Sequence, residues 1–96
     1  MTVNEFAWAM GWYEEAKEIN AEVLTELDKA VVKHGIFQTP MCPAMDQRDR
    51  FVILSEEVGE VARAMTYDEG DKNKLIEELI QVAAMATAAV VGLRNE

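Results

Sequence analysis

Hydrophobic positions recur at helical spacing in the first third of the chain. Gly11 can divide this stretch into a short lead segment and a longer helix, and Thr2 and Glu5 have the spacing of a capping box. The pattern predicts helix over residues 3–34, because apolar side chains follow one another about every four residues. These are Ile19, Val23, Leu27 and the pair Ala30/Val31.

Helical periodicity stops between His34 and Asp46. Gly35 is suited to end the first helix, and Pro40 and Pro43 exclude a continuing helix. The segment His34–Asp46 is therefore predicted to be a loop that separates the first helix from the rest of the chain.

Helix-forming residues resume after this loop. The pattern predicts a second helix from about Gln47 to Tyr67 and a turn over residues 68–71. Asp71 is the predicted N-cap of a third helix that ends near Leu93. Strand signals are scarce, so we expect an all-α fold: one domain over residues 1–96, built as a small bundle of three to four helices.

Each of the last two predicted helices carries a core stripe of apolar residues and, beside it, a second stripe that contains polar residues. The predicted core stripes are Phe51, Leu54, Val58, Val61 and Met65 in one helix, and Leu75, Leu79, Val82, Ala86 and Leu93 in the other. The neighbouring stripes are Ile53, Glu57, Glu60 and Ala64, and Lys74, Glu78, Gln81 and Met85. In the first neighbouring stripe, two carboxylates lie between apolar ends. In the second, two oxygen-bearing side chains interrupt a face that continues apolar through Met85, Ala88 and Ala89.

A short connection between these helices favours antiparallel packing, which can bring the polar positions together. Glu57, Glu60, Glu78 and Gln81 would then surround one point. Carboxylates so close repel one another, and burial increases the cost. Oxygen donors suit Mg²⁺ or Mn²⁺, whereas zinc favours His and Cys. Because magnesium often shares its ligands with phosphates, the arrangement predicts a phosphate ligand held through metal.

The same glutamate spacing occurs a second time, in the segment Glu14–Glu18. Its stripe, which includes Glu15, Glu18 and Glu22, is polar throughout, and no second acidic pair follows at a suitable distance. This copy predicts a solvated helix face. The glutamate spacing alone is therefore weak evidence of a metal site. Glu57 and Glu60 differ from the copy at Glu14–Glu18 because apolar residues surround them on their stripe.

Composition narrows the classes of function. The formal net charge is −9, which disfavours nucleic-acid binding in the absence of a basic patch. The lone Cys42 permits no disulfide within the chain and fits a reducing cytosol. No signal-like start and no unbroken apolar run near 18 residues is found, so we expect a cytoplasmic protein that does not interact with membranes. Trp8 and Trp12, one turn apart, are predicted to pack in a core or interface.

The chain resembles the MazG-like proteins of the all-α NTP pyrophosphohydrolase superfamily over about residues 18–92, with residues 1–17 as an N-terminal helical extension. The resemblance is carried by Glu56, Glu57 and Glu60, followed after 17 residues by Glu78. The wider text "HGIFQ", "LSEEVGEVARAM" and "KLIEELIQVAAMATAAV" is similar as well.

The resemblance implies a Mg²⁺-dependent enzyme that hydrolyses a nucleoside triphosphate to the monophosphate and pyrophosphate. It also implies a homo-oligomer, a dimer or a tetramer, that completes the helical bundle. Carried over to this sequence, the metal ligands are Glu57, Glu60, Glu78 and Gln81. Glu56 would be a further ligand or act on the attacking water, with Glu56 and Glu57 as the catalytic pair. Lys74 would contact a substrate phosphate, or lie exposed in the first helical turn.

Position 81 departs from the family pattern, which has aspartate where this chain has Gln81. An amide oxygen can still coordinate a cation, but the site loses one negative charge and any base at this position. Three hypotheses stay open: an active hydrolase, a nucleotide- and metal-binding module with little turnover, and an acidic interaction protein such as a DNA mimic. A di-iron bundle would need Glu-x-x-His motifs, and the sole histidine, His34, is not in one.

Overall fold

The computed structural model describes residues 1–66 and 71–96, and these residues form α-helices, one short 3₁₀ helix and no strand. The all-α prediction is thus confirmed. The predicted turn at 68–70 and the predicted helix end at Tyr67 lie outside the described residues. The elements are α1 Val3–Ala9, α2 Trp12–His34, η1 Ile36–Gln38, α3 Gln47–Thr66 and α4 Lys72–Arg94.

The helix boundaries follow the signals in the sequence. Thr2 caps α1 by accepting a hydrogen bond from the backbone N–H of Glu5 at 3.1 Å. Gly11 separates α1 from α2 with φ of 75°, and Gly35 ends α2 with φ of 81°. Both values lie in the region that favours glycine. Asp71 caps α4 through the backbone N–H three residues later.

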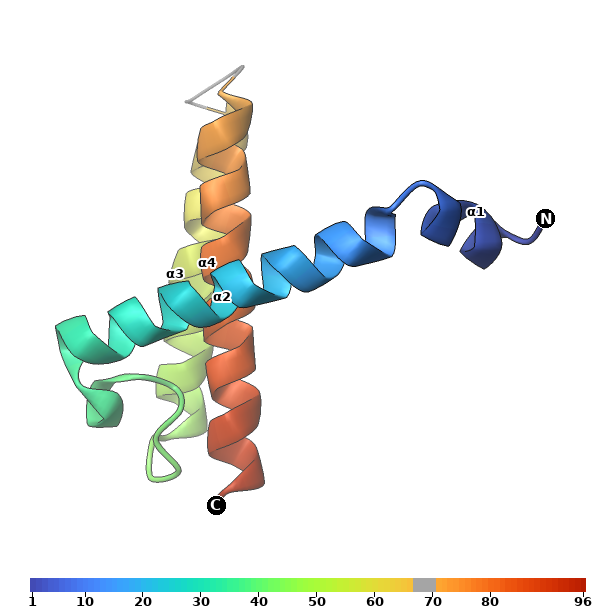
Figure 1. Cartoon of the computed structure of the whole chain (residues 1–96). Helices are drawn as coiled ribbons and strands as arrows, with labels where there is room; N and C mark the ends of the chain where they lie inside the picture. The colour runs from blue at the N-terminus through green and yellow to red at the C-terminus, as the bar shows by residue number, and fades with distance from the viewer. Residues whose placement is uncertain (67–70) are drawn as a thin grey trace.

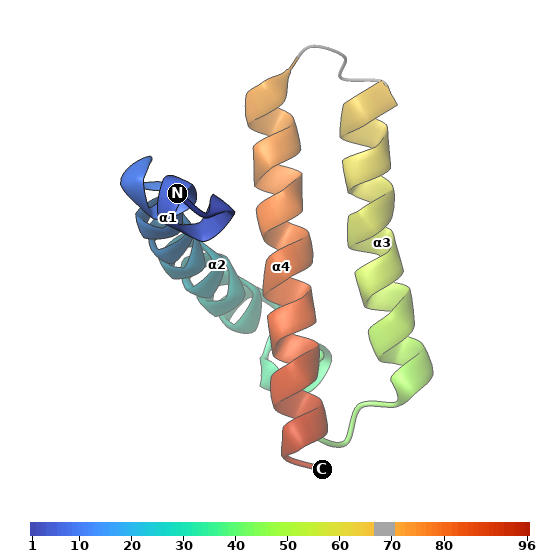
Figure 2. The ribbon, with the colours of Figure 1, turned by 90° about the vertical axis from the view of Figure 1, so that its right-hand side faces the viewer.

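Helices α3 and α4 run antiparallel beside each other (Figure 2), and α2 crosses α4 (Figure 1). The buried core lies where α2 meets α4: Val23 and Leu27 pack near Ala84, Met85 and Ala88. Ala84 and Ala88 are 0% exposed. Their small side chains leave little between the two helix backbones, which lets α2 pack closely across α4.

The predicted core faces of α3 and α4 are largely wrong for the single chain, although Leu54 does pack against the core. Phe51 is 71% exposed, and Val58, Met65, Leu79 and Leu93 are exposed as well. The neighbouring stripes contribute the buried Ala64 and Met85 and, packed against the core, Ile53. The fully buried Ala84 lies on neither stripe of α4, and Ala88 continues the face that carries Met85. Helix α2 packs across α4, where it covers alanines, and no described element covers the larger apolar side chains of α3 and α4.

A buried arginine joins the 40–42 segment to the start of α3 and the end of α4. Arg50 is 4% exposed, and its guanidinium donates to the carbonyl oxygens of Pro40 at 3.2 Å and Cys42 at 2.8 Å. It also pairs with Glu96 at 2.7 Å. Gly92 of α4 lies directly against this group, because a Cβ built there would be 2.6 Å from Arg50 Nη2.

The N-terminal aromatic residues pack against one another rather than in the core. Phe6 and Trp12 make an edge-to-face contact with ring centroids 5.4 Å apart, and Trp8 lies 4.6 Å from the Tyr13 ring. Both tryptophans stay about half exposed. Helix α2 also continues without a break through residue 17, where the N-terminal extension was predicted to end.

Helix α4 is long and apolar enough to cross a membrane, judged by length and composition alone. The sequence expectation considered only unbroken apolar runs, and it missed α4 because isolated polar residues such as Gln81 and Thr87 hardly lower the mean hydropathy of the whole helix. Core helices of soluble proteins pass the same test, so this property does not assign a membrane.

Two helical glycines should respond in opposite ways to alanine. Gly92→Ala places a Cβ against Arg50 and the Pro40 carbonyl, so we expect it to lower the free energy of unfolding by about 2 kcal/mol. Gly59→Ala meets nothing within 4 Å, and we expect a gain of about 0.5–1 kcal/mol because alanine is the better helix former.

Chemical denaturation followed by circular dichroism measures both variants. Gly59→Ala is the matched control, since it is the same substitution in the middle of a neighbouring helix. Equal stabilisation by the two alanines would contradict the close contact between Gly92 and Arg50.

Candidate functional site

A cavity of about 510 Å³ lies between α2, the 38–40 segment and the facing sides of α3 and α4. One part of its lining carries acidic and amide side chains: Glu56, Glu57, Glu78 and Gln81. The C-terminal part of α2 contributes Lys29, Lys33 and His34. The cavity therefore combines carboxylates with cationic groups and has the size of a small-molecule site.

The polar side chains reach this cavity because apolar residues one turn away fix their helices. Ile53 packs against the core and places Glu57, four residues later, on the same side of α3. Met85 is buried on α4, and Gln81 lies one turn before it. The packing of Ile53 and Met85 thus fixes which faces of α3 and α4 point to the cavity, and these faces carry Glu57 and Gln81.

Glu57 is a carboxylate of the cavity whose charged form is disfavoured by its surroundings. Partial burial raises the pKa of Glu57, and the neighbouring carboxylates of Glu78, Glu60 and Glu56 raise it further. Glu78 belongs to α4 and Glu57 to α3. The antiparallel pairing of these helices therefore brings the two carboxylates close enough for their charges to interact.

Glu78 is partnered within its own helix. Its side chain is 12% exposed, and Lys74 Nζ lies 3.0 Å from its carboxylate. Lys74 is not among the residues that line the cavity. Its predicted contact with a substrate phosphate stays a prediction, and in this structure the amine neutralises Glu78.

Glu60 is near enough to Glu57 to raise the pKa of that carboxyl, but it does not line the cavity. Glu60 lines a different depression on α3, with Arg63 at 3.9 Å from its carboxylate. Glu56 is exposed and lines the cavity beside Glu57. The second copy of the glutamate spacing behaves as predicted, because Glu14, Glu15 and Glu18 are all exposed.

Sequence reasoning missed the contribution of α2. The Gln81 amide nitrogen donates to Glu26 Oε2 at 2.7 Å, and Lys29 Nζ donates to Glu26 Oε1 at 3.0 Å. These hydrogen bonds, the one from Lys29 first and the one from Gln81 second, lower the pKa of Glu26. The only signal in the sequence is that Glu26 adjoins the buried Leu27 on α2, and it does not name a partner.

The donor chemistry at the cavity fits a hard cation, since Glu57, Glu78 and Gln81 offer carboxylate and amide oxygens. Burial and then the repulsion from neighbouring carboxylates raise the pKa of Glu57, and a divalent cation would relieve that repulsion. Over residues 1–66 and 71–96, no three His, Cys, Asp or Glu side chains are gathered closely enough to hold a metal ion as they stand.

Comparison of the chain with protein-family models, with curated proteins and with solved structures gave no match. The residues that line the cavity, and the resemblance of the acidic motif to MazG-like proteins, are therefore the only grounds for proposing a function.

Glu57→Gln should stabilise the metal-free protein. A raised pKa means that the folded state holds the proton more tightly than the unfolded chain, so the ionised carboxylate disfavours folding at neutral pH. We expect the variant to gain about 0.5 kcal/mol at pH 7, comparable to removing one like-charge pair on a helix. The gain should shrink as pH falls towards the pKa of Glu57.

Thermal unfolding in EDTA at pH 7 and pH 5 measures this effect. Glu15→Gln, at the corresponding position of the exposed copy of the motif, is the control and should show no gain. A loss of stability in Glu57→Gln without metal would contradict the repulsion among these carboxylates.

Proposed function

We propose that this protein is a Mg²⁺-dependent nucleoside triphosphate pyrophosphohydrolase, which converts an NTP or dNTP to the monophosphate and pyrophosphate. The observation that carries the proposal is the mixed lining of the cavity: Glu57 and Glu78 near Lys29 and Lys33 of α2. A triphosphate bound through a cation needs both kinds of group, because its oxygens carry more charge than one divalent cation neutralises. The resemblance of the acidic motif to MazG-like proteins supports the same reaction.

Each residue then has a role that its position allows. Glu57, Glu78 and Gln81 would hold the cation, and Mn²⁺ is a possible substitute; Glu60 stays a predicted ligand. When bound, the cation supplies charge neutralisation at the phosphates. Glu56, at the exposed edge of the cavity, orients or deprotonates the water. Lys29 and Lys33 attract the phosphate chain.

Hydrolysis is tested by pyrophosphate release from a panel of NTPs and dNTPs with Mg²⁺ or Mn²⁺. We expect release by the wild-type protein and a loss of at least 100-fold in kcat/KM for Glu78→Gln, since a carboxylate ligand is replaced by a neutral amide. Glu15→Gln should keep wild-type activity.

Two other outcomes have clear meanings. Tight nucleotide binding without release, even with Mn²⁺, would identify a binding module and sink the enzyme proposal; the neutral amide at position 81 makes this the second candidate. If neither Mg²⁺ nor a non-hydrolysable nucleotide shifts the melting temperature, the acidic interaction protein is favoured, and the net charge of −9 is its motivation.

The shape of the single chain supports a homo-oligomer. Its radius of gyration is 15.5 Å, whereas a compact domain of this length has roughly 12–13 Å. Its accessible surface is 7074 Å², roughly 1,500 Å² above that of a folded monomer of this mass. This excess is enough for an ordinary interface of about 800 Å² per partner. The exposed apolar residues of α3 and α4 are the proposed contact, and Trp8 and Trp12 are further candidates. The alanine-rich part of α4 is a weaker one, because Ala84 and Ala88 are already buried within the chain.

Light scattering coupled to gel filtration tests the oligomer. We expect a mass of at least twice the chain mass of 10.8 kDa, and dissociation when Phe51→Glu and Met65→Glu are combined, because both side chains are exposed in the single chain. Ala21→Glu, on an exposed part of α2, should leave the mass unchanged. A monomeric wild-type protein at micromolar concentration would rule out this interface.

A further inference from the structure

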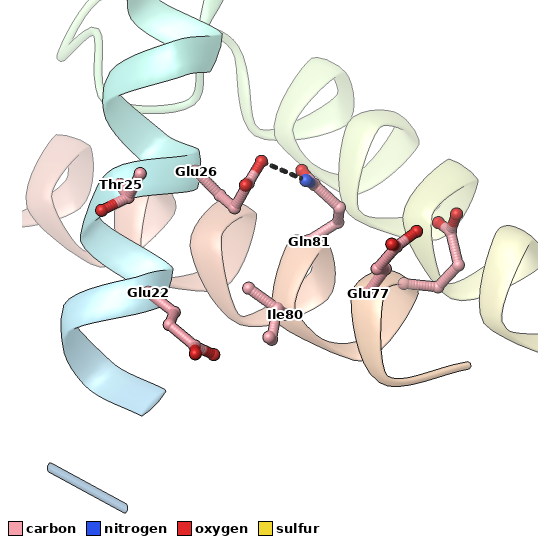
Figure 3. Close-up of a pocket in the computed structure, with 7 residues that line it drawn as sticks. Glu22, Thr25, Glu26, Glu77, Ile80 and Gln81 are labelled. Atoms are coloured by element: carbon pink, nitrogen blue, oxygen red, sulfur yellow. Dashed lines mark hydrogen bonds between the residues drawn. The ribbon is translucent and has the colours of Figure 1, made fainter. Parts of the chain in front are cut away.

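Glu26 is held from two directions beside the cavity. Its Oε2 accepts from the Gln81 amide nitrogen at 2.7 Å, and its Oε1 accepts from Lys29 Nζ at 3.0 Å. Figure 3 shows the Glu26 carboxylate of α2 turned towards the Gln81 amide of α4. Glu22, one turn earlier on α2, has its carboxylate turned away from Gln81 (Figure 3). The contact with Gln81 thus distinguishes Glu26 from its acidic neighbour.

This contact decides which way round the Gln81 amide lies. The reverse orientation would place the amide oxygen against a carboxylate oxygen, and neither group has a proton to donate. With its nitrogen held towards α2, the amide keeps its oxygen as the atom able to face a cation. The hydrogen bond is partly buried, so water competes with it less than at an open surface.

The contact also explains why a neutral side chain suits position 81. An acidic side chain there would meet the Glu26 carboxylate at hydrogen-bond distance, and two like charges so close repel strongly. Gln81 avoids this repulsion. The negative charge next to position 81 then comes from α2, where Lys29 partly balances it.

We propose that Glu26 is a positioning residue for Gln81: it directs the amide oxygen to the cavity and supplies, from α2, the negative charge that the amide lacks. The inference rests on the proposed metal-dependent function. It adds that Gln81 and Glu26 act as one unit drawn from two helices, so neither residue can be exchanged alone without loss.

A stability cycle in EDTA tests the contact without metal or substrate. Gln81→Glu, of nearly the same shape, should lower the melting temperature by roughly 3 °C or more, because it faces Glu26. Glu26→Gln together with Gln81→Glu restores a donor–acceptor pair with the roles exchanged, and should recover most of this loss. Additive effects in the double variant would overturn the proposal.

Calorimetric titration with Mg²⁺ tests positioning. We expect Glu26→Met, which removes the acceptor, to weaken Mg²⁺ binding about tenfold, as removal of a residue that orients a ligand does. The double variant Glu26→Gln/Gln81→Glu should stay within about threefold of wild type, and Glu22→Gln should not differ from it. A purely structural role for Glu26 would lower stability in Glu26→Met and leave its Mg²⁺ affinity unchanged.

The possible failures are distinguishable. Unchanged Mg²⁺ affinity in Glu26→Met overturns the inference and leaves the proposed function standing. Wild-type protein that binds Mg²⁺ but releases no pyrophosphate overturns the hydrolase, while the role of Glu26 is still decided by the Mg²⁺ titration. Wild-type protein that binds no Mg²⁺ overturns both.

Discussion

The close crossing of α2 over α4 is the contact on which the rest of the structure depends. Ala84 and Ala88 are fully buried under Val23 and Leu27, and their small side chains set the separation of the two helices. This crossing brings Glu26 within hydrogen-bonding distance of an amide 55 positions further along the chain. A larger residue at either alanine would push α2 outward and open the cavity on its α2 side.

Arg50 gives the cavity its second support. An arginine is rarely buried unless its charge is paired, and this one is satisfied by two carbonyl oxygens and a carboxylate. Because those carbonyls belong to the segment between α2 and α3, the guanidinium holds the part of the chain that contributes Thr39 and Pro40 to the cavity. The site is therefore set by two contacts outside the acidic motif.

Two features of the single chain are left uncompensated, the charge of Glu57 and the exposed apolar residues of α3 and α4. Burial and neighbouring carboxylates disfavour the charge of Glu57, and α3 and α4 leave large apolar side chains such as Phe51 and Met65 exposed. A cation with a phosphate ligand would relieve the first, and a second copy of the chain the second. Both lie on the same two helices, so assembly and the site are physically linked in the function we propose.

The sequence by itself determined the helices and their ends, because capping groups, glycines and prolines act within a few residues. It also placed Glu57 on a stripe with apolar ends, and Glu78 and Gln81 on a stripe that continues into Met85, since helical geometry fixes which positions share a face. Only the tertiary structure decided which faces of α3 and α4 are buried, and on α4 it buried Ala84 and Ala88 because α2 packs there. It alone joined Glu26 to Gln81 and placed Glu60 outside the cavity lining, since contacts between distant helices depend on crossing geometry that no local pattern encodes.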